Sequence, residues 1–376
     1  MITVFHMPVR IVFGVDSIKK LGGEAGRLGV NKAMIVTYPD IRRIGILGEI
    51  VNALNAVRID AMVFEKVEPN PRNSTVDEAA AIVRNQKIPL IIGLGGGSAM
   101  DCAKATKLAS AGTKSIWDFT NPQSKPASPT AKLIQIPTLA GTGSEANNFA
   151  IISSWQTHEK ATIFNAGSWP EIAIIDPKLT ATAPRGLTAS GGVDMFVHAL
   201  ERYFTTDIAP PMSMGFKEVA MRMVLEFLPR ALANPNDLEA REQLCWVSTF
   251  ATSQAALLGG RDGAAPIHAL QHTLAAFYDI PHGDGVAALL VPVMTHLLPT
   301  KKARIDLLGK NVFGENDGIK ATTEWLDSIG MNLKLRDMAV SMSNVEEMAK
   351  SVLKSTPGID EYFDAKSIIK ILQDAY

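Results

Sequence analysis

The first half of the chain alternates between short apolar runs and amphipathic segments. Apolar runs of this length, rich in branched side chains, predict buried β-strands. The runs cover Lys32–Tyr38, Asp60–Val67, Leu90–Leu94, Lys132–Thr138 and Ile172–Asp176. Helical periodicity lies between them, over Ser17–Leu28, Ile44–Ala56, Thr75–Gln86 and Ser98–Ala109. Continuous apolar strands separated by amphipathic helices are typical of an α/β domain with a parallel sheet covered on both faces.

The pattern changes in the second half of the chain. Beyond Pro184 no run alternates as a strand would, and long helical patterns dominate. They cover Met212–Leu228, Asp237–Ala256, Ala321–Ile329 and Asn344–Ser351. We therefore expect an α/β domain over residues 1–183 and a helical domain over residues 184–376. A cleft between two such domains is a common place for a small-molecule site.

The near-neutral net charge of the chain excludes some classes of binding partner. Among 376 residues there are 37 Lys and Arg against 38 Asp and Glu, a net charge of -1, with no basic run. This argues against nucleic acid and anionic membranes as partners. The apolar segment Val286–Pro299 is interrupted by Pro292 and His296 and is shorter than the ~20 residues that span a bilayer. Because the N-terminus also lacks a signal-peptide pattern, we expect a cytoplasmic protein that binds a small molecule.

Residues 90–104, LIIGLGGGSAMDCAK, read as a strand, a glycine run and a helix. The missing Cβ atoms of Gly95, Gly96 and Gly97 would let a phosphate reach the backbone. Ser98 is expected to cap the helix, whose first N–H groups would face the anion. Such turns also occur where packing requires glycine, and Ser98 departs from the usual dinucleotide fingerprint. A second loop of small and hydroxyl residues, PTLAGTGSE at 137–145, follows the next strand, and two such loops favour a dinucleotide.

Histidines and an aspartate recur at helical spacing in the second half. Asp194 and His198 are four residues apart, which places both on one face of a helix, and so are His268 and His272. His282 follows in a Pro-Gly segment that we expect to be a loop. One carboxylate with two or three imidazoles suits Fe²⁺ or Zn²⁺ and leaves a position open for substrate. A single histidine of this kind is more often a hydrogen-bonded core residue, so the prediction depends on the clustering.

Four segments, in order, resemble the iron-containing (group III) alcohol dehydrogenase family over nearly the whole chain. GGGSAMDCAK and PTLAGTGSE are similar to its cofactor segments, and GGVDMFVHALE and HALQHTLAAFYDIPHG to its metal segments. The resemblance implies a dinucleotide-binding α/β domain and an all-α metal-binding domain, in a dehydroquinate synthase-like architecture. It also implies an active site in the cleft between them.

The resemblance also implies roles for individual residues. The implied metal ligands are Asp194, His198, His268 and His282, and His272 is implied near the metal, in proton transfer. The implied cofactor segments contain Asn70, Gly95, Gly96, Gly97, Ser98, Asp101, Thr138, Thr142 and Lys160.

At two cofactor positions the chain departs from the family. Tyr38 stands where the family often has an Asp that binds the adenosine ribose hydroxyls. A carboxylate there would repel a 2′-phosphate, so its absence leaves both NAD and NADP open. Leu139 replaces a Thr and removes one hydroxyl from the cofactor loop.

The resemblance implies NAD(P)-linked dehydrogenation of a small alcohol or diol, or reduction of an aldehyde. Fe²⁺, or Zn²⁺, would polarise the substrate oxygen. A homodimer or larger homo-oligomer is also implied. Alternatives of the same fold are a maleylacetate-reductase-like and a glycerol-dehydrogenase-like oxidoreductase. An alternative of another class is a non-catalytic nucleotide-binding protein with a structural metal.

Overall fold

The computed structural model describes residues 5–121, 123–126, 128–206, 210–253, 256 and 265–376. Their contacts form two compact units. The sheet unit contains residues 6–183 and 235–249, and the helical unit contains residues 184–234 and 250–376 together with Phe5. Most of helix α8 (Leu238–Ala251) thus packs with the sheet. A division of the chain into folding domains at residue 183 stays a prediction.

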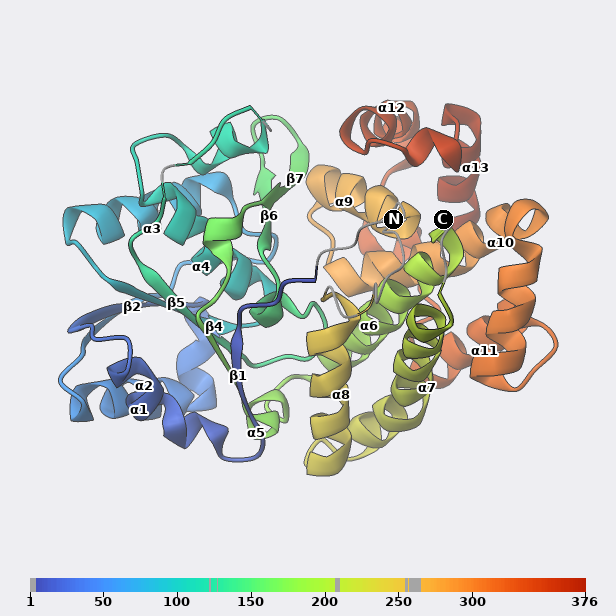
Figure 1. Ribbon diagram of the computed structural model, residues 1–376. Helices are drawn as coiled ribbons and strands as arrows, with labels where there is room; N and C mark the ends of the chain where they lie inside the picture. The colour runs from blue at the N-terminus through green and yellow to red at the C-terminus, as the bar shows by residue number, and fades with distance from the viewer. Residues whose placement is uncertain (1–4, 122, 127, 207–209, 254–255, 257–264) are drawn as a thin grey trace. The chain divides into compact units, whose positions relative to one another are not determined.

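The sheet unit is built on a six-stranded parallel sheet (Figure 1). The strand order is β1 (Arg10–Phe13), β8 (Ile172–Ile175), β5 (Lys132–Pro137), β4 (Leu90–Gly95), β2 (Lys32–Val36) and β3 (Asp60–Phe64). The parallel sheet is confirmed, and so are its five predicted strands. Strand β1 was not predicted, because it is a four-residue edge strand without a fully buried side chain.

Successive side chains of the central strands point to opposite faces of the sheet. Ile91 joins the apolar cluster that contains α3 (Asn73–Asn85) and α4 (Gly97–Ala109). Its neighbours on β4, Leu90 and Ile92, join the cluster formed with α1 (Leu21–Gly26) and α2 (Ile46–Ala56) (Figure 1). Because helices bury both faces, these strands read as continuous apolar runs.

Two further strands form a separate antiparallel hairpin. They are β6 (Phe149–Ser154) and β7 (Glu159–Phe164), and the sequence patterns did not predict them. Lys160, one of the expected cofactor residues, lies on β7. The short helix α5 (Pro177–Thr180) follows β8, and the Asp176 carboxylate caps it by accepting from the Lys178 N–H at 3.0 Å.

The helical unit confirms that the second half of the chain is mainly helical. Its helices are α6 (Arg185–Thr205), α7 (Pro211–Ala233), α9 (Pro266–Tyr278), α10 (His282–Leu308), α11 (Gly318–Ile329), α12 (Val345–Ser355) and α13 (Ala365–Ala375). Helix α10 packs against α6, α9, α11 and α13. The helix expected over Asp237–Ala256 ends earlier, at Ala251, and residues 254 and 255 lie outside the described part of the chain.

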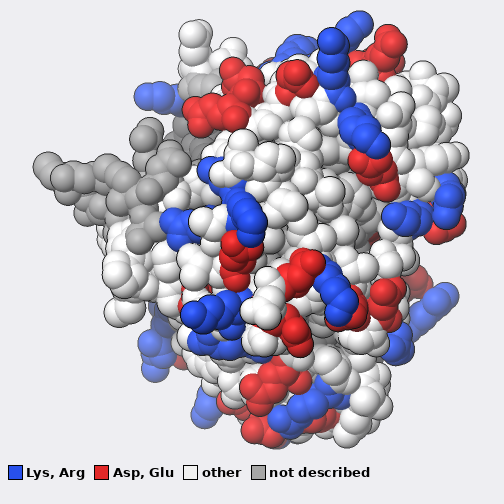
Figure 2. Space-filling model, turned by 90° about the vertical axis from the view of Figure 1, so that its right-hand side faces the viewer, with Lys and Arg blue, Asp and Glu red and all other residues white. Residues whose placement is uncertain are grey.

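The outer helices carry paired charges. Lys302 lies 2.8 Å from Asp306, and Lys320 lies 3.0 Å from Glu324, each pair one turn apart on its helix. Figure 2 shows basic and acidic side chains interspersed over the face turned to the viewer, as expected for a net charge of -1. Among the helices that the structure describes, none is both long enough and apolar enough to cross a membrane.

Candidate functional site

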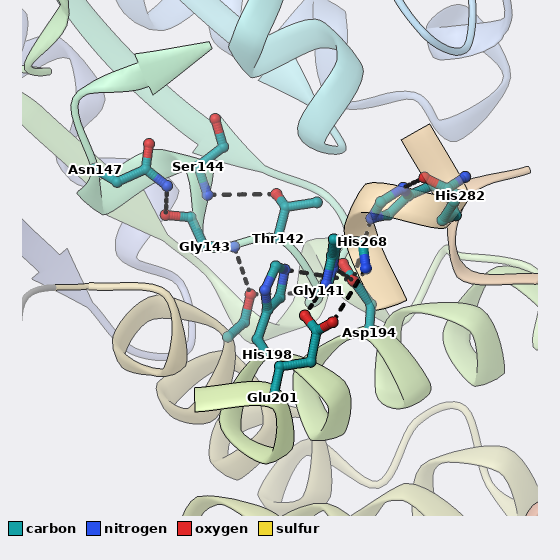
Figure 3. A network of polar contacts seen from close by, with 12 residues as sticks. Gly141, Thr142, Gly143, Ser144, Asn147, Asp194, His198, Glu201, His268 and His282 are labelled. Atoms are coloured by element: carbon teal, nitrogen blue, oxygen red, sulfur yellow. Dashed lines mark hydrogen bonds and ion pairs between the residues drawn. The ribbon is translucent and has the colours of Figure 1, made fainter. Parts of the chain in front are cut away.

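The predicted metal ligands come together in the helical unit. Asp194 and His198 lie one turn apart on α6, His268 lies on α9, and His282 is the first residue of α10. The Asp194 Oδ1 atom lies 3.3 Å from Nε2 of His198, 3.2 Å from Nε2 of His268 and 3.3 Å from Nε2 of His282 (Figure 3). Donor atoms of Asp194, His268 and His282 all lie within 4.8 Å of one another. One carboxylate oxygen thus faces three imidazole nitrogens.

The rings of His198 and His272 lie at different distances from the ring of His268. The ring of His198 stacks on that of His268, with 4.3 Å between centroids and 16° between planes. The ring centroid of His272 lies 6.2 Å from that of His268 and 5.9 Å from that of His282. His272 is therefore at the margin of the cluster, and its part in proton transfer stays a prediction.

The Asp194 carboxylate is held in its ionised form by the histidines around it. Burial opposes ionisation of Asp194, but the charges and hydrogen bonds of His198, His282 and His268 outweigh it and hold its pKa well below the usual range. Burial lowers the pKa of His198 despite the opposing charge of Asp194. Burial also acts to lower the pKa of His268, but Glu201 and Asp194 raise it to about 9. An ionised carboxylate and a neutral imidazole are what a divalent cation requires as ligands.

The expectation that His282 lies in a loop is wrong. Pro281 is extended (φ -58°, ψ 136°) and helix α10 begins directly after it, at His282. Gly283 lets this first turn lie against α6, since a Cβ there would fall 2.5 Å from the carbonyl oxygen of Ser190. The Ser190 hydroxyl donates a hydrogen bond to Asp284. These contacts bring His282 to the side of α6 that carries Asp194.

Two side chains that hold the ligand histidines were not predicted. Glu201, buried on α6, accepts a hydrogen bond from Nδ1 of His268 (Figure 3). It also accepts from two backbone N–H groups of α9, those of Ile267 and His268. The Oε1 atom of Gln271 lies 2.6 Å from Nδ1 of His282. The spacing of Glu201 could have revealed it, because it stands seven residues, or two turns, after Asp194. No spacing rule indicates Gln271.

Two of the three glycines at the junction of β4 and α4 are required by packing. A Cβ on Gly95, whose φ is +145°, would fall 2.8 Å from Cβ of Ala99. A Cβ on Gly97 would fall 2.6 Å from Cγ2 of Thr142. At Gly96 the new atom would meet only Leu139, at an ordinary distance of 3.7 Å. Gly96 is thus the one glycine of this run that packing leaves unexplained.

The expected cap of α4 is wrong. The helix begins at Gly97 with Gly96 as its N-cap, so Ser98 lies inside the first turn. The Met100 N–H bonds to the Gly96 carbonyl at 3.2 Å, which closes the first turn. The preceding N–H groups of the helix have no partner one turn back, a geometry that suits an anion.

The loop that follows β5 is braced within the sheet unit. The Ser248 hydroxyl, on α8, accepts from the N–H groups of Gly141 at 2.8 Å and Gly143 at 3.3 Å. Asp101 accepts from the Ser144 hydroxyl at 2.6 Å (Figure 3 shows the loop). Asp101 therefore holds the loop, and its direct contact with a cofactor stays a prediction.

Other expected cofactor residues form two pairs. Thr138 lies near Tyr38, and burial raises the pKa of the Tyr38 phenol. The Lys160 ammonium donates to Oδ1 of Asn70 at 2.8 Å. Thr138 also lines a pocket of about 290 Å³ in the sheet unit, together with Ile46, Leu179 and Thr182.

Comparisons with known proteins agree along the whole chain. Residues 8–177 match the family model described as iron-containing alcohol dehydrogenase, and residues 188–376 match the C-terminal model of the Fe-containing alcohol dehydrogenase family. NADH-dependent butanol dehydrogenase A of Clostridium acetobutylicum is 30% identical over 386 residues, covering 99% of each chain. 1,3-Propanediol dehydrogenase of Klebsiella pneumoniae is 30% identical over 354 residues, covering 91% of this chain and 90% of that protein.

Solved structures give the same result. The crystal structure of NADH-dependent butanol dehydrogenase A from Thermotoga maritima superimposes with a TM-score of 0.94 at 28% identity. It covers 100% of this chain, which covers 98% of that one. With the Asp-His cluster and the sequence matches, these likenesses lead to one conclusion: this chain belongs to the iron-containing alcohol dehydrogenase family.

Proposed function

We propose that this protein is a metal-dependent, NAD(P)-linked oxidoreductase that interconverts a small alcohol or diol with its aldehyde. The observation that carries the proposal is the convergence of three imidazole Nε2 atoms on Asp194 Oδ1, at 3.2 to 3.3 Å. A group of one carboxylate and three imidazoles is a suitable donor set for Fe²⁺, and for Zn²⁺.

The proposed ligands are Asp194, His198, His268 and His282. When bound, the divalent ion supplies Lewis-acid polarisation of the substrate oxygen. The chain's own contribution is to hold the four donors next to one another. Asp194 and Glu201 are both buried and would offset the two positive charges of the ion. His272, at the margin of the cluster, is the proposed path for the alcohol proton.

The proposed nucleotide site lies in the sheet unit. The first N–H groups of α4, next to Gly96, would bind the diphosphate through the positive end of the helix dipole. Gly95, Gly97, Ser98, Thr142 and Leu139 complete this turn and the facing loop. The pairs Tyr38–Thr138 and Asn70–Lys160 would contact the rest of the dinucleotide, which supplies or accepts the hydride.

The relatives indicate the class of substrate. Their names refer to butanol and 1,3-propanediol, which are short alcohols without a charge. We propose substrates of that size, and a homodimer or larger homo-oligomer in the cytoplasm. Size-exclusion chromatography with light scattering would test the assembly, and a single 40.4 kDa species would contradict it.

A metal-exchange assay tests the function. Chelated protein receives Fe²⁺ without oxygen, or Zn²⁺, and is then assayed with short alcohols and aldehydes against NAD(H) and NADP(H). Metal-dependent turnover of the nicotinamide supports the proposal. Folded protein that binds nucleotide and metal but turns over no alcohol, glycerol or maleylacetate would favour the non-catalytic alternative. Turnover of glycerol or maleylacetate alone would move the assignment to those branches of the fold.

A further inference from the structure

We propose that Glu201 is a positioning residue that keeps the proton of His268 on Nδ1 and so directs the Nε2 lone pair toward the metal. The proposal rests on the proposed function, because it assumes that the Asp-His cluster binds a cation. It concerns a residue of α6 that lies beside the ligands and is not one of the four itself.

Glu201 is surrounded by hydrogen-bond donors. Its Oε1 atom accepts from the backbone N–H of Ile267 and, at 3.1 Å, from that of His268. Its Oε2 atom accepts from the His268 ring at Nδ1. The side chain of Glu201 is only 2% exposed, so water does not compete for these bonds. One buried carboxylate thus serves three N–H groups.

The same carboxylate acts as the cap of α9. That helix begins at Pro266 after Ala265, whose methyl group cannot accept a hydrogen bond. Ile267 and His268 belong to the first turn, where N–H groups have no partner within the helix. Glu201 supplies the missing acceptor from another helix, and its charge also suits the positive end of α9. The position of the His268 backbone and the orientation of its ring are therefore set by one side chain.

The chemistry of the acceptor fixes the tautomer of His268. An ionised carboxylate accepts hydrogen bonds and donates none, so Nδ1 must carry a proton. With Nδ1 protonated, Nε2 is the ring nitrogen left to bind a cation, and it lies 3.2 Å from Asp194 Oδ1. Carboxylates that hold the other nitrogen of a ligand histidine also raise its basicity. At His282 the side chain that faces Nδ1 is the neutral amide of Gln271, and a carboxylate is the stronger acceptor of the two.

Substitution E201Q would reverse this hydrogen-bond pattern at one atom. The new amide oxygen would still accept from the two N–H groups of α9, so the cap is kept. The amide NH₂ would then face Nδ1 of His268, where two donors cannot pair. The ring would satisfy the amide by moving its proton to Nε2, the atom that must bind the metal. E201Q should therefore weaken metal binding more than it weakens the fold.

The test compares E201Q with E218Q in the metal-free full-length protein. Glu218 is a matched control in the same unit, because its Oε1 accepts from Tyr203 at 2.8 Å and from Asn311 at 2.9 Å, bonds that an amide oxygen can keep. Competition titration with Zn²⁺ should give a Kd raised about 10- to 100-fold in E201Q and unchanged in E218Q. The Co²⁺ absorption spectrum should change in E201Q alone. A Kd within twofold of wild type and an unchanged spectrum would overturn the proposal.

A measurement on the wild-type protein covers the case in which E201Q does not fold. In Zn²⁺-loaded protein with ¹⁵N-labelled histidine, His268 should show a protonated Nδ1 with slow hydrogen exchange and a metal-bound Nε2. An unprotonated Nδ1 would refute the role of Glu201. If wild-type protein binds no metal at all, the proposed function fails first. If it binds metal and E201Q binds equally well, only the role of Glu201 fails.

Discussion

Gly283 and Ser190 lie in backbone contact: a Cβ on Gly283 would fall 2.5 Å from the Ser190 carbonyl oxygen and 2.8 Å from its Cβ. The contact joins the first turn of α10 to α6. His282 precedes this glycine, and Asp194 follows Ser190 by one turn of α6. The geometry of the proposed metal ligands therefore depends on how closely the two helices approach.

Substitution G283A should separate these helices at the ligands. Neither the carbonyl nor the Ser190 side chain is the flexible end of a long chain, so the new methyl group must displace a helix. Overpacking of this kind costs about 1–3 kcal/mol. We expect a lower melting temperature and weaker Zn²⁺ binding, measured by thermal unfolding and competition titration. G215A is the control, because a Cβ there has no neighbour within 4 Å. Equal metal affinity in G283A and wild type would contradict this account.

Substitution D194N should remove metal binding with little change in shape. The three imidazoles would face an amide in place of a carboxylate, and the cluster would lose its charge. The loss of metal affinity should exceed the 10- to 100-fold that is typical when a residue hydrogen-bonded to a ligand is replaced. Metal content by mass spectrometry and turnover should fall together, and H268A should behave alike. H158A, which removes a histidine from the turn between β6 and β7, should leave both unchanged. Full turnover in H268A would refute the ligand set.

The proximity of Asp194, His198, His268 and His282 could be predicted from the sequence more fully than the residues that surround them. Helical spacing was enough to place Asp194 and His198 on one face of α6, because that property is local. Spacing places Glu201 on the face of α6 that carries Asp194, but its hydrogen bonds depend on where α9 begins in space, which no local pattern records. The same holds for β1, whose four residues become a strand only through their pairing with β8. His282 was wrongly expected in a loop because the sequence Pro-His-Gly is typical of a turn. The contact of Gly283 with Ser190, which the sequence does not reveal, lies in the first turn of a helix.

Removal of the metal should destabilise the protein. A cation that binds only the folded state adds about 2.7 kcal/mol when its concentration is 100 times its Kd. Without it, the Asp194 carboxylate remains buried among three histidines. We expect the melting temperature to fall on chelation and to recover on addition of Fe²⁺ or Zn²⁺, as followed by circular dichroism. D194N is the matching control, because its melting temperature should change neither on chelation nor on addition of metal. No change in wild type would mean that the cluster does not bind metal in the folded protein.

Substitutions at Gly96 and Gly97 should separate phosphate binding from packing. A Cβ at Gly97 would fall 2.6 Å from Cγ2 of Thr142, so G97A should lower both stability and dinucleotide affinity. A Cβ at Gly96 would meet only Leu139 at 3.7 Å, and its φ of -77° suits alanine. G96A should therefore keep the melting temperature and lose affinity, because its methyl group would stand where the diphosphate approaches the helix. Calorimetric titration with NADH measures this. Normal affinity in G96A would place the diphosphate elsewhere.

Substitution Y38D should shift the choice of dinucleotide. Tyr38 stands next to Gly95 and Thr138, and the family often has an aspartate at this position. A carboxylate would accept hydrogen bonds from the ribose hydroxyls of NAD and repel the 2′-phosphate of NADP, and like charges brought together cost several kcal/mol. We expect the ratio of kcat/KM for NADH over NADPH to rise about tenfold or more. Y38F keeps the ring and adds no charge, so its ratio should stay near that of wild type. If Y38D and Y38F shift the ratio equally, then the hydroxyl of Tyr38 sets the preference, and charge repulsion does not.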